Sequence, residues 1–151
     1  MSAHLRQKKT AERVSQNPHT SLSCCAVQVP WFSFREQTSN SRYNLDDLPH
    51  GTEREVTLSL LYTRLRELSR ETWLYWGQLR KQFGLETMEV KDLNFSPGGG
   101  IELPKDQTIY IFRFDTYQGA NKGRIIGYKD DPCAVLHIIG FDVDFKAYDH
   151  G

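Results

Sequence analysis

The chain has 151 residues, the size of one ordinary domain, and it can bury a hydrophobic core without disulfides or a metal. Its 19 basic and 19 acidic side chains cancel, and no part of the sequence is strongly basic. This balance excludes the broad basic surface that many nucleic-acid-binding proteins use, so any site for an anion has to be a local cluster of charges.

The cysteines and the apolar runs narrow the class of protein further. Three cysteines, two of them adjacent, do not make a disulfide framework, and the sequence has no Cys-x-x-Cys pair for a structural zinc ion. No apolar run reaches the roughly 18 residues that a membrane-spanning helix needs, and the N-terminal stretch lacks the apolar core of a secretory signal. We therefore expect a cytoplasmic protein that uses no metal, no cofactor and no membrane.

The N-terminal part divides into a tail and the start of a domain. Residues 1–23 are polar and slightly basic, which predicts a flexible tail, with an arm that docks on a partner or on RNA as the alternative. Residues 24–151 are expected to form a single domain. Within it, the aromatic stretch 28–35 predicts a strand, and Pro30 favours an edge position because proline cannot donate a hydrogen bond to a neighbouring strand.

A helix is predicted to begin at Thr52, because Thr52 and Glu55 match a capping box. Apolar residues then recur at steps of three and four, which is typical of an amphipathic helix: Val56, Leu60, Leu61, Leu65, Leu68, Trp73, Trp76 and Leu79. The pattern allows one helix as far as Phe83, or a break near Ser69 that makes a helical hairpin. The next stretch, 85–94, is either a strand or one helical turn, and Gly98 to Gly100 form a hinge or mobile loop.

Three apolar stretches in the last third predict strands at 108–115, 124–129 and 133–141. The turns between them are short, so the strands should form an antiparallel meander, and the third is apolar enough to be central. The expected fold class is α+β. A twisted antiparallel sheet, made of the N-terminal strand and the meander, would carry one long or two short helices on one face.

Four motifs in this region carry a family resemblance. They are Phe112-Arg113-Phe114, the string KGRIIGYKD at 122–130, the strand VLHII at 135–139, and the acidic tail from Asp142 to His150. Together they resemble the RelE/ParE superfamily of small bacterial toxins. The resemblance covers about the last 45 residues, and residues 28–90 match it only in the order of their elements.

The resemblance implies a toxin that cleaves messenger RNA, free or on the ribosome, and that a cognate antitoxin protein neutralises. Such toxins use no metal. The 2′-hydroxyl attacks the adjacent phosphate and leaves a cyclic phosphate. This reaction needs a group that removes the hydroxyl proton, cations that stabilise the phosphorane, and an acid for the leaving oxygen. Arginine suits the phosphate because it stays charged and binds oxygen atoms in pairs.

Two arginines are the first candidates for this chemistry. Arg113 lies between Phe112 and Phe114, so the alternation of a strand turns it to the face opposite the two rings. If the rings face the helix, Arg113 lies on the open face of the sheet as a phosphate clamp; the alternative is an ion pair with Asp115 or a neighbouring strand. Arg124 is expected near Arg113 across the ladder, where two like charges are costly unless something offsets them.

The other candidates come from the third strand and the tail. His137 would face the same side and act as a base or acid near neutral pH, or it is an ordinary strand histidine. Tyr148 and His150 would complete the site, or they belong to a frayed terminus. Three residues are candidates for binding RNA, with solvated lysines as the alternative for two of them: Lys122, Tyr128 and Lys129.

Two rival functions remain open. Neutral charge and an acidic tail favour a non-catalytic, protein-binding regulator on the same scaffold, such as a degenerate toxin or a protein of a phage or mobile element. The third interpretation is a single-strand RNA-binding module that stacks bases on exposed aromatic residues: Trp31, Phe32 and Tyr117.

Overall fold

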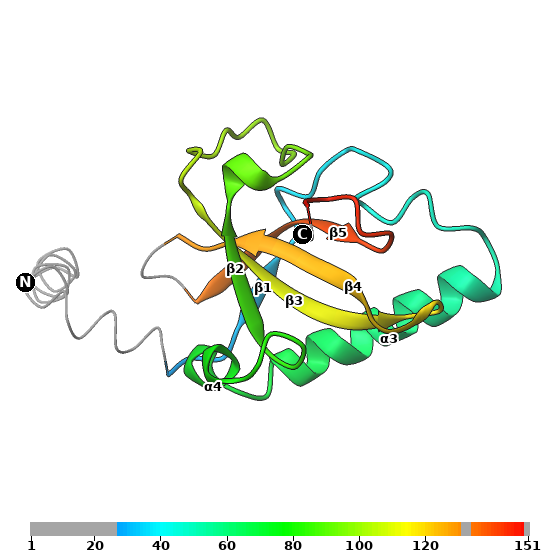
Figure 1. Ribbon diagram of the computed structural model, residues 1–151, viewed down its shortest axis with the longest axis horizontal. Coiled ribbons are helices and arrows are strands. Elements are labelled where there is room, and N and C mark those ends of the chain that lie inside the picture. The colour runs from blue at the N-terminus through cyan, green and yellow to red at the C-terminus, as the bar shows by residue number, and fades with distance from the viewer. Residues whose placement is uncertain (1–26, 131–133, 150–151) are drawn as a thin grey trace, which may run out of the picture.

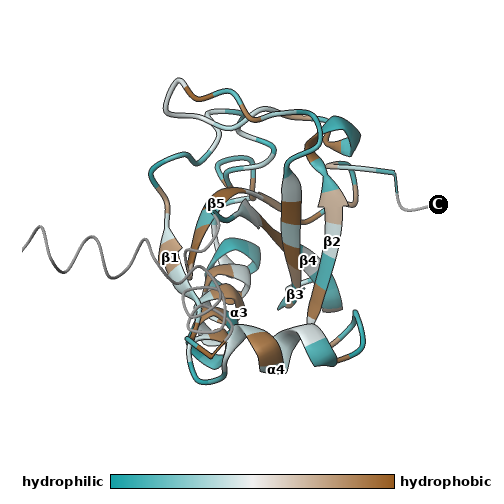
Figure 2. Ribbon diagram, turned by 90° about the vertical axis from the view of Figure 1, so that its left-hand side faces the viewer, coloured by the Kyte–Doolittle hydropathy of each residue, from teal (hydrophilic) through white to brown (hydrophobic). Residues whose placement is uncertain are grey.

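The computed structural model describes residues 27–130 and 134–149, which form an α+β fold of three layers (Figure 1). The middle layer is a five-stranded sheet. Helices α3 (Thr52–Leu68) and α4 (Trp73–Gln78) lie on one face of the sheet, and long loops lie on the other (Figure 2). The predicted tail at 1–23, all three cysteines and His150 fall outside the described residues.

The strand order of the sheet is β1-β5-β4-β3-β2. The three C-terminal strands form the predicted antiparallel meander, but its middle strand, β4, is the centre of the sheet, and β5 lies between β4 and β1. The strands run as follows: β1 (Trp31–Ser33), β2 (Leu85–Glu89), β3 (Thr108–Thr116), β4 (Gly119–Tyr128) and β5 (Val135–Asp142).

Two features of the sheet differ from the expected one. β1 is an edge strand, as Pro30 indicated, but it is only three residues long and runs parallel to β5, so the sheet is mixed. The ambiguous stretch 85–94 contains both alternatives. Its first half is β2, which pairs with β3 and adds a fifth strand, and a single 3-10 turn (Val90–Asp92) follows.

The helices form a hairpin, so the alternative of one helix as far as Phe83 is wrong. α3 ends at Leu68, and the indole Nε1 of Trp76 in α4 donates a hydrogen bond of 3.0 Å to the Leu68 carbonyl. The carbonyls of a last helical turn have no partner within the helix, and this bond satisfies one of them. Thr72 then caps α4 by accepting a bond from the amide of Tyr75.

The predicted capping box at Thr52 is also wrong. The N-cap is Gly51, whose φ of 97° lies in the left-handed region that favours glycine, and within the described chain no side chain caps this end. Thr52 is therefore already helical, one position too late to act as the cap. The predicted apolar stripe is shifted at its start as well, because Thr57 is buried while Val56 is 36% exposed.

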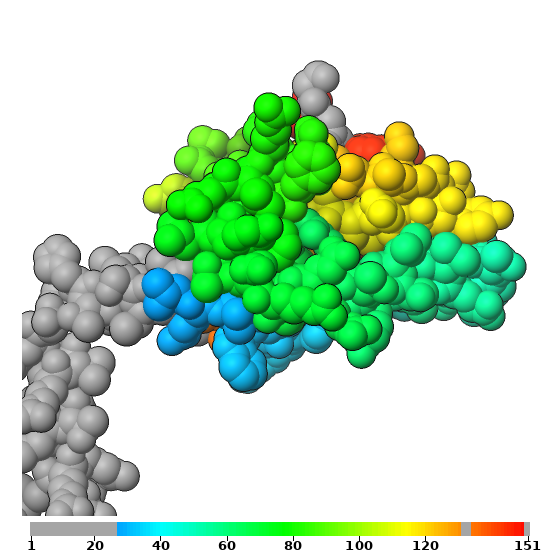
Figure 3. Space-filling model, turned by 90° about the horizontal axis from the view of Figure 1, so that it is seen from below, coloured from blue at the N-terminus to red at the C-terminus, as the bar shows by residue number. Residues whose placement is uncertain are grey.

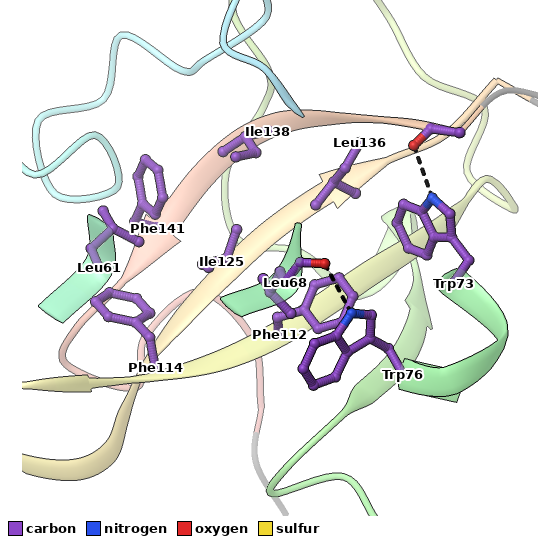
Figure 4. Packing of buried hydrophobic residues seen from close by; sticks show 11 residues of the cluster. Leu61, Leu68, Trp73, Trp76, Phe112, Phe114, Ile125, Leu136, Ile138 and Phe141 are labelled. Carbon is purple, nitrogen blue, oxygen red and sulfur yellow. Dashed lines mark hydrogen bonds between the residues drawn. The ribbon is translucent and has the colours of Figure 1, made fainter. Parts of the chain in front are cut away.

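The main hydrophobic core lies between the hairpin and the sheet (Figure 4). Trp73 and Trp76 contact the ring of Phe112, and the Trp73 Nε1 donates a bond of 2.9 Å to the Ala134 carbonyl at the start of β5. Seen from below, α3, α4 and the segment around β1 cover this side of the sheet (Figure 3). The buried members of the main core are Leu61, Leu68, Trp73, Trp76, Phe112, Phe114, Ile125, Ala134, Leu136, Ile138 and Phe141.

A second core lies on the opposite face, which the sequence pattern predicts to be open. Tyr43 and Phe95 stack there with ring centroids 4.5 Å apart, and both come from loops. These loops close over the middle of the sheet, so the expectation of a free face is wrong there. The buried members are Tyr43, Ile109, Ile111, Ile126, Tyr128, Ile139 and Ala147.

Substitution of Gly123 in β4 tests the side-chain packing of the main core. A side chain at Gly123 would overlap the ring of Phe114, its direct partner on β3. We expect Gly123→Ala to lower the free energy of unfolding by roughly 1–3 kcal/mol, because the buried ring has to move. Denaturant unfolding measures the change.

Gly77→Ala is the matched control. Gly77 lies in α4 with nothing within 4 Å of an added Cβ. Alanine is the better helix former, so this variant should be as stable as the wild type or more stable by up to about 1 kcal/mol. Equal stability of the Gly123→Ala variant and the wild type would contradict the packing described for Phe114.

Candidate functional site

Arg113 and Arg124 face each other directly across β3 and β4. Phe112 and Phe114 lie in the main core, so both arginines lie on the face away from the helices, which is the orientation expected for Arg113. Two guanidinium groups in this position repel each other. The pair is therefore stable only with a compensating negative charge.

Glu86 on β2 supplies that charge. Its Oε2 lies 3.1 Å from Nη2 of Arg113, and its Oε1 lies 3.7 Å from Nε of Arg124. The carboxylate is only 12% exposed. Sequence reasoning missed Glu86, because the stretch 85–94 had no single secondary structure. Alternation along β2, which turns Met88 to the second core and Leu85 to the main core, is the signal that points Glu86 to this face.

Arg124 is held deeper than Arg113. It is 4% exposed, and its Nη1 donates to the carbonyls of Asn121 (2.7 Å) and Gly123 (3.0 Å). Arg113 is 26% exposed and so can be reached from solvent. Among the described residues, the buried Nε–H groups of both arginines have no hydrogen-bond partner.

Tyr148 joins this group from the tail. Its hydroxyl donates a hydrogen bond of 2.8 Å to Oε1 of Glu86. Burial, together with the hydrogen bond and the charge of Glu86, raises the pKa of the phenol above its ordinary value, while Arg124 acts in the opposite direction. The phenol is thus neutral at physiological pH. We call Glu86, Arg113, Arg124 and Tyr148 the arginine cluster.

A buried carboxylate folds the tail back toward the cluster. Asp142, opposite Arg124 in the sheet, is fully buried and accepts hydrogen bonds from the amides of Asp144, Lys146 and Ala147 at 3.0–3.2 Å. Because these bonds and the Tyr148–Glu86 bond hold it, the tail is part of the folded domain as far as Tyr148, and the alternative of a frayed terminus does not apply to that residue. Within the turn, burial and the neighbouring Asp142 carboxylate raise the pKa of Asp144.

Phe145 projects from this turn beside the arginine cluster. Its φ of 60° lies in the left-handed region, which a bulky residue rarely adopts and which costs roughly 1–3 kcal/mol. The ring is 39% exposed, and two cations lie against it: the guanidinium of Arg124 at 5.2 Å and Nζ of Lys122 at 5.5 Å. Lys122 is thus the one predicted RNA-binding residue that lies at the cluster.

His137 belongs to a different site. It shares the face of the arginines, but it pairs with Tyr128, four residues along β4 from Arg124, which is about 13 Å at the rise of a strand. Its ring stacks on Tyr128, its Nδ1 lies 3.2 Å from Glu36 Oε2, and its Nε2 lies 3.5 Å from Asp130 Oδ2. The expectation that His137 joins the arginines in one site is therefore wrong.

The two remaining RNA-binding candidates are also remote from the cluster. Tyr128 is buried beside His137, and its pKa is raised by this burial and then by the charges of Glu36 and Asp130. Nζ of Lys129 lies 4.1 Å from the ring centroid of Trp73, on the helical side of the sheet. Neither residue can contact a phosphate that Arg113 binds.

Comparisons of the chain with protein-family models, with curated proteins and with solved structures found no match. In residues 27–130 and 134–149, no group of three or more His, Cys, Asp or Glu side chains converges to hold a metal ion. The helices described here also include none with the length and apolarity to cross a membrane.

The charge of Glu86 is expected to stabilise the fold. Glu86→Gln leaves two guanidinium groups side by side with no carboxylate between them, and should lower the free energy of unfolding by roughly 3–5 kcal/mol. The control is Glu89→Gln on the same strand, whose ion pair with Lys91 is exposed to solvent. Surface pairs contribute little, so its unfolding midpoint should match the wild type. Equal midpoints for both variants would show that Glu86 does not hold the arginines together.

The raised pKa of Tyr148 predicts a pH dependence of stability. The folded pKa lies above the unfolded value of about 10, so the contribution of the phenol is complete below that pH and is lost as pH rises toward the folded pKa. The stability difference between wild type and Tyr148→Phe should be constant below about pH 10 and should narrow above it. Denaturant unfolding across this range measures the difference, and parallel curves would contradict the assignment.

Proposed function

We propose that this protein cleaves RNA at the arginine cluster without a metal, as a toxin of the RelE/ParE type. The observation that carries the proposal is the direct pairing of Arg113 with Arg124, joined through one carboxylate to a neutral phenol. These are the groups that transfer of a phosphoryl group to a neighbouring hydroxyl requires: cations, a base and an acid.

Glu86 and Tyr148 suit the two proton transfers. Glu86 takes the proton of the 2′-hydroxyl, whose oxygen then attacks the phosphorus. Tyr148 gives its proton to the 5′-oxygen as the bond from phosphorus to that oxygen breaks, which leaves a 2′,3′-cyclic phosphate and a 5′-hydroxyl. The 2.8 Å hydrogen bond between the two side chains then lets the proton on Glu86 return to Tyr148, so the site is regenerated without an external group.

The two arginines stabilise the negative charge of the phosphorane in different ways. The Arg113 side chain is 26% exposed, so the accessible part of its guanidinium can bind a phosphate oxygen directly. Arg124 is buried, and its charge acts through a medium of low polarity, where an electrostatic interaction is stronger than in water. The carboxylate of Asp142 opposes this field less than its position suggests, because three backbone amides already bind it.

The proposed biological setting follows from the same family resemblance. The substrate is messenger RNA, free or on the ribosome, and the partner is a cognate antitoxin protein. A protein that binds RNA along its whole surface needs a net positive charge, whereas RNA binding at one small site needs only a local cluster of cations. The neutral net charge of this chain fits the second case. His137 lies outside this mechanism.

Purified protein should cut a single-stranded RNA and leave a cyclic phosphate, and should not cut the same RNA with a 2′-deoxy nucleotide at the scissile position. Glu86→Gln should reduce the rate by about 100-fold or more, because a general base contributes at least that factor. Assays with and without ribosomes, followed by mass spectrometry of the products, measure both effects. Expression of the wild type in bacteria should arrest growth.

Glu89→Gln is the control for activity as well, since Glu89 lies on the same strand but pairs with Lys91 in solvent. It should cut at the wild-type rate. Thermal unfolding of each variant separates loss of chemistry from loss of fold. An inert wild type that neither cuts RNA nor arrests growth would overturn the proposal.

Burial of Arg124 favours a second candidate, a non-catalytic protein-binding regulator on the same scaffold. The guanidinium of Arg124 already donates hydrogen bonds to two backbone carbonyls, as that of an arginine with a structural role does. For this candidate, the wild type would bind a protein partner and leave RNA intact, and Arg113→Ala would change neither property.

A further inference from the structure

Arg64 of α3 is a mostly buried arginine on the helical side of the sheet, and the proposed reaction does not use it. Its Nε donates to the carbonyl of Arg113 on β3, and its Nη2 donates to the carbonyl of Phe83, each at 2.8 Å. The side chain is 13% exposed, and its guanidinium carbon lies 5.1 Å from the ring centroid of Trp76 in α4. Arg64 therefore joins α3, α4, β3 and the segment that leads into β2 at one point.

The Arg113 carbonyl lies where the ladder between β2 and β3 ends. The last pair of this ladder is Leu85 with Phe112. One step further, the antiparallel register brings Gly84 opposite Arg113, but Gly84 lies outside β2. A backbone carbonyl at the end of a ladder still needs a donor, and here Arg64 is the donor. We call Arg64 with the carbonyls of Phe83 and Arg113 the Arg64 clamp.

The clamp lies beside the strand that carries Glu86. β2 has five residues and is an edge strand that pairs only with β3, and Glu86 is its second residue. The Glu86 carboxylate has to stay 3.1 Å from Nη2 of Arg113 and 2.8 Å from the hydroxyl of Tyr148. Arg64 holds the backbone on both sides of the first contact, at Arg113 itself and at Phe83, which precedes Glu86 by three residues.

We propose that Arg64 is a positioning residue for the arginine cluster, which fixes the start of β2 against β3 so that Glu86 reaches Arg113. It acts through the backbone from the other face of the sheet and contacts no reacting atom. Its effect on cleavage rests on the proposed function, whereas its effect on the contact between Glu86 and Arg113 does not. A guanidinium is needed, because one planar group has to bond two carbonyls and lie against an aromatic ring.

A double-mutant cycle between Arg64→Ala and Glu86→Gln tests the clamp without RNA. In the wild type, Glu86→Gln should lower the denaturant midpoint, because it leaves the two arginines without their carboxylate. In the Arg64→Ala background, the same change should lower the midpoint by about half as much or less, because Glu86 has already moved away from Arg113. An arginine that only packs α3 against the sheet would give equal shifts in both backgrounds, which would overturn the proposal.

Arg64→Lys keeps the test decisive if the alanine variant does not fold. Lysine retains the charge and the aliphatic stem, but its single ammonium group cannot replace the planar guanidinium. The shift caused by Glu86→Gln should again be smaller than in the wild type. The control is Arg66→Lys on the same helix, whose guanidinium carbon lies 5.7 Å from the ring centroid of the exposed Tyr62. In that background, the shift caused by Glu86→Gln should equal the wild-type shift.

Kinetics of RNA cleavage test whether the clamp serves the reaction. Arg64→Ala should lower kcat about 100-fold, which is the cost of misplacing a catalytic group by about 1 Å. KM should stay within about threefold of the wild type, because Arg113 remains to bind the phosphate. Arg66→Lys should cleave with the kcat of the wild type.

Guanidinium ion can replace the missing side chain of Arg64→Ala. A cavity of about 460 Å³ is lined by Arg64 together with Trp76, Phe83 and Arg113, so a small cation can enter the space that alanine leaves. At concentrations too low to unfold the protein, guanidinium should raise kcat of Arg64→Ala. It should not raise kcat of Glu86→Gln, which lacks the carboxylate that the clamp positions.

The outcomes separate the clamp from the proposed reaction. A reduced Glu86→Gln shift in the Arg64 variants, with no cleavage of RNA by the wild type, would support the clamp and overturn the reaction. Equal shifts in all backgrounds would overturn the clamp even if the wild type cuts RNA. A folded Arg64→Ala variant with the kcat of the wild type would overturn it as well.

Discussion

Two like charges face each other across β3 and β4, and this constraint organises one whole side of the molecule. Arg113 and Arg124 are tolerable neighbours only because Glu86 approaches them from β2. β2 must therefore pair with β3 in the observed register, which places Glu86 opposite Ile111. The fifth strand is thus an electrostatic requirement of the arginine pair as well as an extension of the sheet.

The rest of this face is built by segments that have no regular structure. The carboxylate of Asp142 accepts hydrogen bonds from three backbone amides of the tail. The hydroxyl of Tyr43 donates to the carbonyl of Lys146, and the backbone amide of Asn94 donates to the carbonyl of Ala147. Two separate loops therefore meet the tail, and the three segments together enclose the second core. Their polar groups are satisfied mutually, which allows loop backbone to cover a sheet at little cost. The arginine cluster lies at the margin of this layer, where charge and partial access coexist.

Local periodicity predicted what depends on local geometry. Alternation along β3 placed Arg113 opposite the core rings, and the short turn to β4 placed Arg124 across from it. Alternation gives the face of a residue but not its distance along the strand, so it cannot reveal that His137 lies four residues along the ladder from Arg124. The role of Glu86 depends on pairing between strands far apart in sequence, which no local pattern reveals. The predicted cap failed for a related reason, since the torsion of Gly51 is set by the loop before it.

The parallel pair of β1 and β5 has a consequence for the order of folding. Trp31 pairs with Val135, so the edge of the sheet joins segments separated by most of the domain. Pairing of this kind closes a long loop, and such contacts form late and slowly. The helical hairpin and the turn between β3 and β4 can form while the chain is being synthesised. The arginine cluster cannot be completed at that stage, because Asp142 ends β5 and Tyr148 follows it. Glu86 emerges before both arginines and can offset them, but the phenol joins the cluster only after residues 142–148 have emerged.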